Sequence, residues 1–314
     1  MPHISLASGR EFDLVRAMLA RWGPLASGVG DDAAVIELPP GERLVVSTDS
    51  SVDGVHFRRE WLSPIEIGYR ATAAALSDLA AMAAAPRGLV IALALPESWL
   101  TAVEALADGI GEAARLSGTP IVGGDITRAS ELSITVTVMG STATPAHRNA
   151  VRPGDYVYVT GVLGGPSAAL RAFEQGAAPD PLVRERFARP RPRLQEGLWL
   201  AQHGVRAMID ISDGLVSELR HLAVASAVEL RVDVDRIPVM RGCTMSDAMR
   251  GGEEYELVLA SPHPIDANEF ARTFALPLSE IARARETEQP AVLGVRGGTG
   301  ERVDLGAGHD HFST

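Results

Sequence analysis

Aspartates beside glycines or at the ends of apolar runs are the residues of this sequence best placed to do chemistry. Asp31 and Asp32 follow a glycine loop, Asp49 ends an apolar run, and Asp125 follows two glycines. Aspartates in turns often only shape a loop. Several carboxylates gathered in one cleft, however, repel one another and need cations to stay ionised together. Mg²⁺ takes such oxygen ligands together with phosphate oxygens, so the pattern favours a site for magnesium and phosphate.

Two other aspartates interrupt apolar stretches. Asp210 lies between Ile209 and Ile211, and Asp78 lies in an alanine-rich stretch that ends at Met82. A carboxylate is costly to bury in such surroundings unless it is paired or bound to a metal. Both aspartates are therefore candidate metal ligands.

Loops that open helices are the third feature of the sequence. Asp213 and Gly214 stand at the expected start of a helix, where Ser212 or Asp213 could act as a plain N-cap. A helix N-terminus also attracts phosphate, so the two interpretations are compatible. The glycine-rich loop 161–165 stands between an expected strand and helix, but its spacing is not that of the dinucleotide fingerprint. His56 is close enough in sequence to reach the cleft of the earlier aspartates.

The composition narrows the class of protein. The 314 residues include 29 Lys+Arg and 40 Asp+Glu, a formal net charge of −11, and every basic residue is arginine. This net negative charge argues against a nucleic-acid surface, which would need a basic patch. Without lysine there is no Walker A loop, protein-kinase site or pyridoxal-phosphate Schiff base. The single cysteine, Cys243, excludes an intrachain disulfide and a multi-cysteine zinc site. No signal peptide or membrane span is visible, so we expect a soluble cytoplasmic protein.

The elements that must position these residues mix helices and strands. In the first half we expect helices at 12–22, 64–82 and 99–116 and strands at 34–37, 44–49, 89–95 and 132–139. Turn chemistry at 151–155 follows a break near Asn149, so we predict two domains, 1–149 and 150–314. In the second half we expect a helix from 213 to about 225 and strands at 156–160, 207–211, 229–234 and 255–260. The predicted fold class is α+β, in the form of two mixed α/β domains.

An ordered set of motifs resembles the thiamine-monophosphate kinase family. This family belongs to an ATP-binding superfamily that includes aminoimidazole ribonucleotide synthetase. Any one motif is weak, but the set occurs in the family's order and spans nearly the whole chain. The motifs are GVGDDAAVI (28–36), STDSSVDGVHF (47–57), LSDLAAM (76–82), GGDITR (123–128), RPGDYVYVTG (152–161), IDISDGL (209–215), GGEEYEL (251–257) and HDHF (309–312).

The resemblance implies a reaction and a fold. ATP would phosphorylate thiamine phosphate to thiamine diphosphate, with several Mg²⁺ ions as cofactors. The N-terminal domain would pair its sheet with that of a second subunit in a homodimer, and the C-terminal α/β domain would close the site. No partner is expected among nucleic acids or membranes. Because the attacking group is an anionic phosphate oxygen, no side chain is needed beyond those that position metal and phosphate.

The resemblance also assigns roles to individual residues. The metal ligands would be Asp32, Ser47, Thr48, Asp49, Asp78, Asp125, Asp210 and Asp213. ATP would be contacted by Gly124, Asp125, Arg148 and Ser212, with Asp31 supporting the loop of Asp32. Thiamine phosphate would be contacted by His56, Glu253 and His309.

Three positions depart from the family pattern, and two alternatives stay open. Glu254 stands where the family has Asp, Gly165 where it has Asp or Ser, and His309 where it has Tyr. The first alternative is a superfamily relative that acts on another acceptor, such as a formylglycinamidine-type substrate or a hydrogenase-maturation carbamoyl group. The second is a non-catalytic dimeric nucleotide-binding or scaffold protein. The second alternative predicts lost acidic ligands, yet all of them are present.

Overall fold

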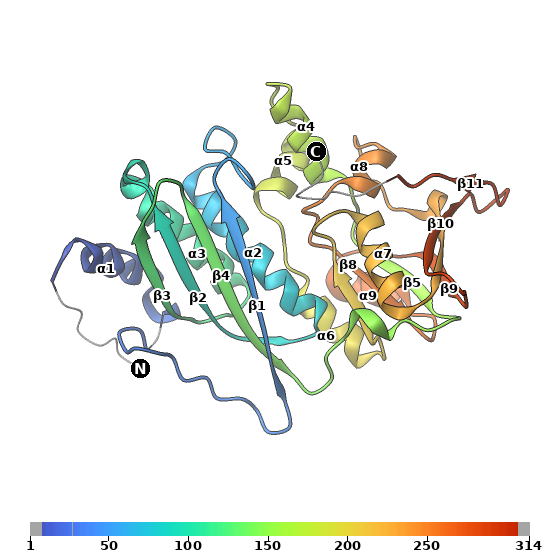
Figure 1. Cartoon of the computed structure of the whole chain (residues 1–314), viewed down its shortest axis with the longest axis horizontal. Coiled ribbons are helices and arrows are strands. Elements are labelled where there is room, and N and C mark those ends of the chain that lie inside the picture. Colours follow the sequence, from blue (N-terminus) through green and yellow to red (C-terminus); the bar gives the residue numbers. More distant parts are fainter. Residues whose placement is uncertain (1–7, 27, 307–314) are drawn as a thin grey trace. The chain divides into compact units, whose positions relative to one another are not determined.

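The computed structural model describes residues 8–26 and 28–306, which divide into two units (Figure 1). Unit 1 contains the described residues up to Leu79 together with 84–143, and unit 2 contains 80–83 and the described residues from Thr144 onward. Each unit combines helices with one β-sheet, which confirms the predicted α+β class. No helix in this part of the chain has both the length and the apolar character to span a membrane.

Unit 1 is built on a four-stranded sheet with the strand order β1-β4-β2-β3. Strand β4 pairs antiparallel with β1 and β2, and β2 pairs parallel with β3. The elements of the unit are α1 (Arg10–Trp22), η1 (Gly23–Leu25), β1 (Arg43–Val52), α2 (Pro64–Ala81), β2 (Ala85–Leu95), η2 (Glu97–Ala102), α3 (Val103–Leu116), β3 (Ile121–Arg128) and β4 (Ser133–Thr142). Helix α2 continues by two residues into unit 2.

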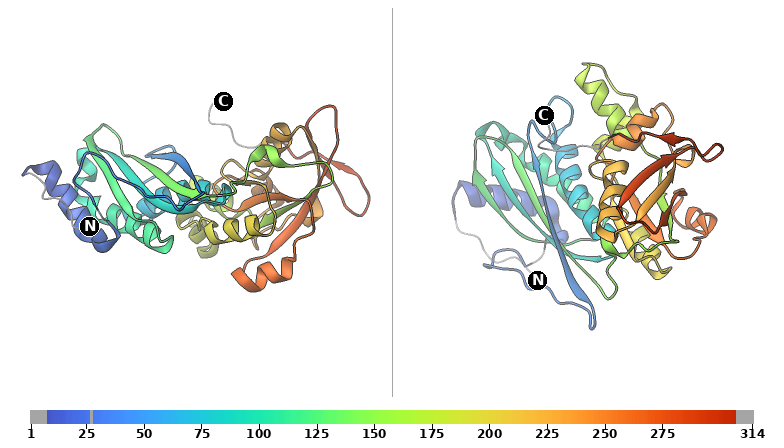
Figure 2. Two further views of the ribbon diagram at one scale, coloured as in Figure 1. Left: turned by 90° about the horizontal axis from the view of Figure 1, so that it is seen from below. Right: turned by 45° about the vertical axis from the view of Figure 1, so that its right-hand side comes forward.

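The two faces of this sheet differ in burial, because successive side chains of a strand point to opposite faces. Helices cover one face of this sheet (Figure 2). Val136 and Val138 of β4 are fully buried and share that face with Ser47, which bonds to α2. Leu44 and Val46 of β1 point to the other face and are 52% and 54% exposed. Helix α2 packs closely on α3 at Gly109, where a Cβ atom would lie 1.9 Å from the carbonyl oxygen of Ile65.

Unit 2 is built on a seven-stranded sheet with the order β11-β10-β7-β9-β5-β8-β6. Leu215, Leu219 and Leu222 of α7 recur at helical spacing and are buried in the core with Val232 and Val258. The elements of the unit are η3 (Arg148–Ala150), β5 (Tyr156–Thr160), α4 (Gly165–Glu174), α5 (Pro181–Ala188), α6 (Leu194–Gln202), β6 (Ala207–Asp210), α7 (Leu215–Ser226), β7 (Glu229–Asp233), η4 (Val234–Arg236), α8 (Met245–Arg250), β8 (Leu257–Ser261), α9 (Ala267–Phe274), β9 (Leu278–Arg285), β10 (Ala291–Val295) and β11 (Arg302–Val303).

Some expected elements differ from the structure. The expected strand at 34–37 is wrong, because these residues belong to no helix or strand. The expected helix at 99–116 begins as the 3₁₀ helix η2 and becomes α-helical only at Val103. The expected strand at 255–260 begins at Leu257, because Tyr255 has a left-handed backbone with φ 53°. Strand β3 runs through 123–125, where the glycines favour a turn, and it has no counterpart among the expected elements, nor do strands β9 to β11.

Candidate functional site

Unit 1 contains a pocket of about 330 Å³ beside the edge of its sheet. Its walls come from α1, from the loop 29–34 and from strands β2 and β3. The pocket brings together the predicted residues Asp32, Gly124 and Asp125, with Asp31 next to them. Apolar residues of α1, such as Phe12 and others at helical spacing, also line the pocket. The pocket thus combines carboxylate oxygens with an apolar surface.

Gly124 is required by the pairing of β3 with β2. A Cβ atom at this position would lie 2.2 Å from the carbonyl oxygen of Ile91 in the neighbouring strand. Since no side chain fits, the backbone of Gly124 stays exposed, and the adjacent Asp125 is exposed as well. A ligand can therefore approach the main chain of β3 directly at this point.

A second group of predicted residues lies where β1 faces α2. Ser47 donates from its Oγ to Oδ2 of Asp78 at 2.5 Å, which gives the carboxylate a partner in the alanine-rich half of α2. Asp49 is two residues further along the strand, on the same face as Ser47, and accepts the N–H of Ser50 at 2.8 Å. The side chain of Thr48 lies on the opposite face, where its Oγ1 is 3.0 Å from Oγ1 of Thr137.

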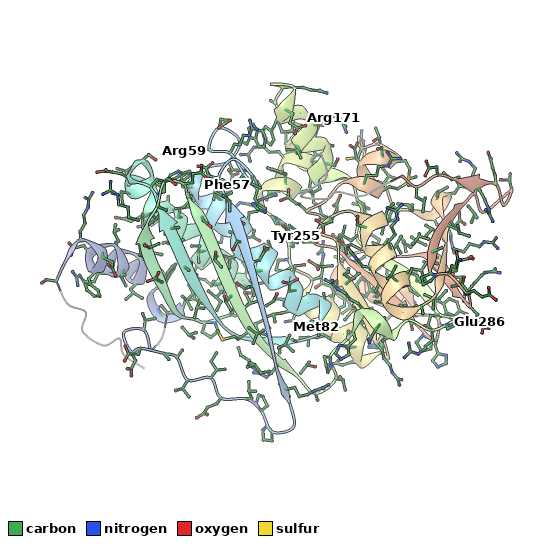
Figure 3. All side chains as sticks on the ribbon, viewed as in Figure 1. Phe57, Arg59, Met82, Arg171, Tyr255 and Glu286 are labelled. Atoms are coloured by element: carbon green, nitrogen blue, oxygen red, sulfur yellow. The ribbon has the colours of Figure 1, made fainter. Side chains whose placement is uncertain are left out.

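His56 is anchored in the turn that follows β1. Its Nδ1 atom accepts the N–H of Val52 at 3.2 Å, so the neutral ring carries its proton on Nε2. The next residue, Phe57, is labelled in Figure 3. It is buried and makes an edge contact with Trp99, with ring centroids 6.4 Å apart. This apolar anchor holds the turn in place.

The donors of unit 1 suit magnesium, although they do not form a closed metal cage. Within residues 8–26 and 28–306, no three His, Cys, Asp or Glu side chains converge to enclose a metal ion. Magnesium commonly binds through one or two protein carboxylates and takes its other ligands from water and substrate phosphates. Paired or single oxygen donors such as Asp78 with Ser47, or Asp125, are the kind of ligand that this mode of binding uses.

In unit 2 the predicted residues Ser212 and Glu253 lie side by side. The N–H of Glu253 donates to the carbonyl oxygen of Ser212 at 2.7 Å, and the N–H of Tyr255 donates to that of Ile211 at 2.9 Å. Gly252 allows this close pairing, because a Cβ atom there would lie 2.3 Å from the carbonyl oxygen of Ser212. The two motifs that contain these residues therefore form one structural unit.

Asp210 and Arg148 lie on other elements of unit 2. Asp210 is the last residue of β6, is 4% exposed, and pairs in register with Leu257 of β8. Arg148 is exposed at the start of η3, where its carbonyl oxygen accepts the hydroxyl of Ser226 at 2.9 Å. The predicted residue His309 lies outside the described residues.

Glu218 is a residue of this region that the motifs do not indicate. Its Oε1 atom accepts the N–H of Asp213 at 3.1 Å and the hydroxyl of Ser212 at 3.4 Å. The pKa of Glu218 is raised to about 7, chiefly by burial and in smaller part by the charge of Asp213, while the hydrogen bond from the Asp213 N–H and the charge of Arg148 act in the opposite direction. Three predicted site residues therefore interact with this one carboxyl group. The signal in the sequence that could have indicated Glu218 is an acidic residue near the start of a helix that follows a polar loop.

The acids of the segment 251–257 divide between surface and interior. Glu253 and Tyr255 both have left-handed backbone, with φ 63° and 53°, and Tyr255 is buried (Figure 3). Glu254 is buried and its Oε1 accepts the N–H of Gly164 in the glycine-rich loop. Glu256 is also buried and its Oε2 accepts the hydroxyl of Thr160 at 2.7 Å. Glu254 and Glu256 thus hold the glycine-rich loop, and Glu253 is the acid of the three that reaches the surface.

Two arginines decide the charge of these interior acids. Burial raises the pKa of Glu254 to about 7, although Arg186, 3.4 Å away, and the N–H of Gly164 act in the opposite direction. Burial would also raise the pKa of Glu256, but Arg193 and Arg186 outweigh it and hold the pKa below its usual value. Glu256 is therefore the ionised partner in this cluster.

Comparisons with known proteins find similar sequences over nearly the whole chain. Residues 30–142 match the family model for the N-terminal domain of AIR synthase related proteins, and residues 152–293 match the model for the C-terminal domain. The chain is 34% identical to thiamine-monophosphate kinase of Salmonella typhimurium strain LT2, over 97% of each chain.

Solved structures show the same similarity in three dimensions. The crystal structure of thiamine-monophosphate kinase from Stenotrophomonas maltophilia K279a superposes with a TM-score of 0.80 at 35% identity, covering 96% of this chain and 99% of the other. The structure of AaThiL complexed with AMPPCP and TMP gives a TM-score of 0.74 at 28% identity, covering 96% and 98%.

Proposed function

Because the chain belongs to the thiamine-monophosphate kinase family, we propose that it transfers a phosphoryl group from ATP to thiamine phosphate, giving ADP and thiamine diphosphate. The observation that carries this proposal is the similarity to a thiamine-monophosphate kinase over 97% of both chains. The similar structure with bound AMPPCP and TMP supports the pairing of a nucleotide with this acceptor.

The chemistry of this transfer matches the side chains that the protein offers. The acceptor is a phosphate oxygen that is already anionic near neutral pH, so the protein need not supply a strong general base. The main barrier is the repulsion between two polyanions, which have to be held in line. Arg148, in a chain without lysine, is proposed to offset part of the phosphate charge.

We propose magnesium as the cofactor. The residues that would hold it are Asp32, Ser47, Thr48, Asp49, Asp78 and Asp125 of unit 1 and Asp210 and Asp213 of unit 2. Among these, Thr48 would contribute its main-chain oxygen, because its side chain lies on the opposite face of β1. When bound, magnesium neutralises phosphate charge and orients the transferred group. The all-oxygen character of this donor set supports magnesium over a transition metal, which would favour nitrogen and sulfur ligands.

The substrate contacts are assigned to both units. Gly124 and Asp125 with their exposed main chain, together with Arg148 and Ser212, are proposed to contact ATP. His56 and Glu253 are proposed to contact thiamine phosphate, because each projects from a turn fixed by backbone hydrogen bonds. His309 stays a prediction of the sequence, as does a cytoplasmic location.

We further propose that the protein is a homodimer that pairs through the sheet of unit 1. The open face of this sheet supports the proposal, because it exposes Leu44 and Val46 next to one another along β1. Large apolar side chains on an uncovered sheet face are typical of a protein interface.

The proposed reaction has a direct test. The purified protein is incubated with ATP, Mg²⁺ and thiamine phosphate, each is omitted in turn, and the products are identified by chromatography. We expect thiamine diphosphate to form one-for-one with ADP only when all three are present. Binding of ATP without formation of thiamine diphosphate would instead favour a superfamily relative that acts on another acceptor.

A further inference from the structure

The loop Ser212–Gly214 is held from two sides. On one side the backbone of the segment 252–255 pairs with it, through the hydrogen bond from Glu253 to Ser212. On the other side Glu218, which is 2% exposed, accepts hydrogen bonds from the loop with a single carboxylate oxygen. The backbone pairing fixes where the loop runs, and Glu218 fixes how its polar groups are turned.

The contacts of Glu218 are those of a group that orients a loop. It takes the main-chain N–H of Asp213 and the side-chain hydroxyl of Ser212, which would otherwise be able to rotate. Gly214, the last residue of the loop, has a backbone φ of 110°. A Cβ atom at this position would lie 2.8 Å from the carbonyl oxygen of Arg250. The backbone therefore has little freedom at Gly214. The carboxyl group of Glu218 acts on the other two residues of the loop, Ser212 and Asp213.

We propose that Glu218 is a positioning residue for nucleotide binding, because it orients Ser212 and Asp213 at the start of α7. It does so by accepting hydrogen bonds, so an uncharged acceptor of the same shape would serve equally. This inference rests on the proposed function, in which Ser212 contacts ATP and Asp213 binds magnesium. It adds Glu218 to the residues that shape that site. It also predicts that loss of Glu218 weakens ATP binding and leaves thiamine-phosphate binding intact.

The test compares Glu218→Ala with Glu218→Gln in steady-state kinetics with each substrate varied. Glu218→Ala removes the acceptor, and we expect the KM for ATP to rise about tenfold or more, with the KM for thiamine phosphate within about twofold of wild type. Glu218→Gln keeps the oxygen that accepts both hydrogen bonds, so it should restore the KM for ATP to within about twofold of wild type.

A matched control separates positioning from general damage to α7. Leu222 is buried one helical turn further along α7, in the same core, and its apolar side chain cannot accept a hydrogen bond from the loop. Leu222→Ala should lower the stability of the protein but leave the KM for ATP near that of wild type. An equal rise in the KM for ATP in Leu222→Ala would overturn the proposal, as would an unchanged KM in Glu218→Ala or a Glu218→Gln variant as impaired as Glu218→Ala.

Two further measurements keep the inference separate from the reaction itself. The affinity for AMPPCP, measured by calorimetry, should fall in Glu218→Ala and recover in Glu218→Gln even if thiamine phosphate proves not to be the acceptor. Hydrogen exchange at the N–H of Asp213 should be faster in Glu218→Ala than in wild type. Unchanged exchange and unchanged AMPPCP affinity would overturn the role of Glu218, whereas a wild-type protein that binds AMPPCP without turnover would overturn only the proposed reaction.

Discussion

At the scale of single residues, His56 is the position where one substitution best separates the two substrates. Its Nδ1 atom is used by the N–H of Val52, so Nε2 is the ring atom that can donate to a phosphate. We expect His56→Ala to raise the KM for thiamine phosphate about tenfold and to change the KM for ATP less than about twofold. Steady-state kinetics with each substrate varied would measure both effects.

A second variant at this position controls for damage to the turn. His56→Asn places an acceptor close to the position of Nδ1, so it can keep the hydrogen bond from Val52 while it removes the distal part of the ring. If the ring contacts the substrate, both variants lose affinity for thiamine phosphate. An unchanged KM for thiamine phosphate in His56→Ala would remove His56 from the site.

The residues that the sequence could indicate are marked by nearby glycines or, like Asp78 and Asp210, by apolar neighbours. Asp32, Gly124 and Asp125 line one pocket, and each lies in a glycine-containing motif that a reader of the sequence can find. Glu218 carries no such mark. Its role depends on the turn of α7 that brings it back onto Ser212 and Asp213, and an acid on a helix is ordinarily read as a solvated side chain.

At the scale of elements, the segment 251–257 shows where prediction from the sequence fails. Two glycines followed by acids suggest a turn with solvated side chains, yet Glu254 and Glu256 are buried. The reason is the left-handed backbone of Glu253 and Tyr255, neither of which is a residue type that favours it. By contrast, α2 at Pro64–Ala81 ends within one residue of the expected boundary, because proline at its start and helical periodicity are local signals.

This segment also predicts how stability depends on pH. The pKa of Glu254 is raised to about 7, so folding favours its protonated form, and that stabilisation is lost as the pH rises from about 4.5 to about 7. The pKa of Glu256 is lowered, so its contribution has the opposite sign and is lost only as the pH falls below its usual value. Glu218, whose pKa is also raised to about 7, adds to the loss on the alkaline side.

A neutral substitution isolates the contribution of Glu254. In Glu254→Gln the side chain cannot ionise but can still accept the N–H of Gly164. Urea unfolding at pH 5, 6, 7 and 8 should show that the free energy of unfolding of the variant, relative to wild type, rises by about 2 kcal/mol across this series. A constant difference between variant and wild type at all four pH values would show that Glu254 does not titrate in this range.

At the scale of the whole molecule, the proposed dimer depends on a face that the chain itself leaves open. β1 is an edge strand of its sheet, and Leu44 and Val46 project from it on the face opposite the helices. Burying two such side chains contributes about 1.5–3 kcal/mol each at full burial, and ionised aspartates there would have to be desolvated instead. We therefore expect Leu44→Asp combined with Val46→Asp to convert a dimer into a monomer, as measured by light scattering after size-exclusion chromatography.

The matched control for this experiment is Leu116→Asp. Leu116 ends α3 in the same unit and is 73% exposed, but it lies on a helix rather than on the open face of the sheet. The same change of charge at this position should leave the dimer intact. This result would distinguish an effect specific to the sheet face from the general effect of replacing an exposed leucine by aspartate. A wild-type protein that is monomeric at the concentration of the kinetic assay, or a double variant that remains dimeric, would contradict the proposed pairing through the sheet.

The double variant should also lose activity only if residues of the second subunit are needed for the reaction, so its turnover number tests whether a single chain is a complete enzyme.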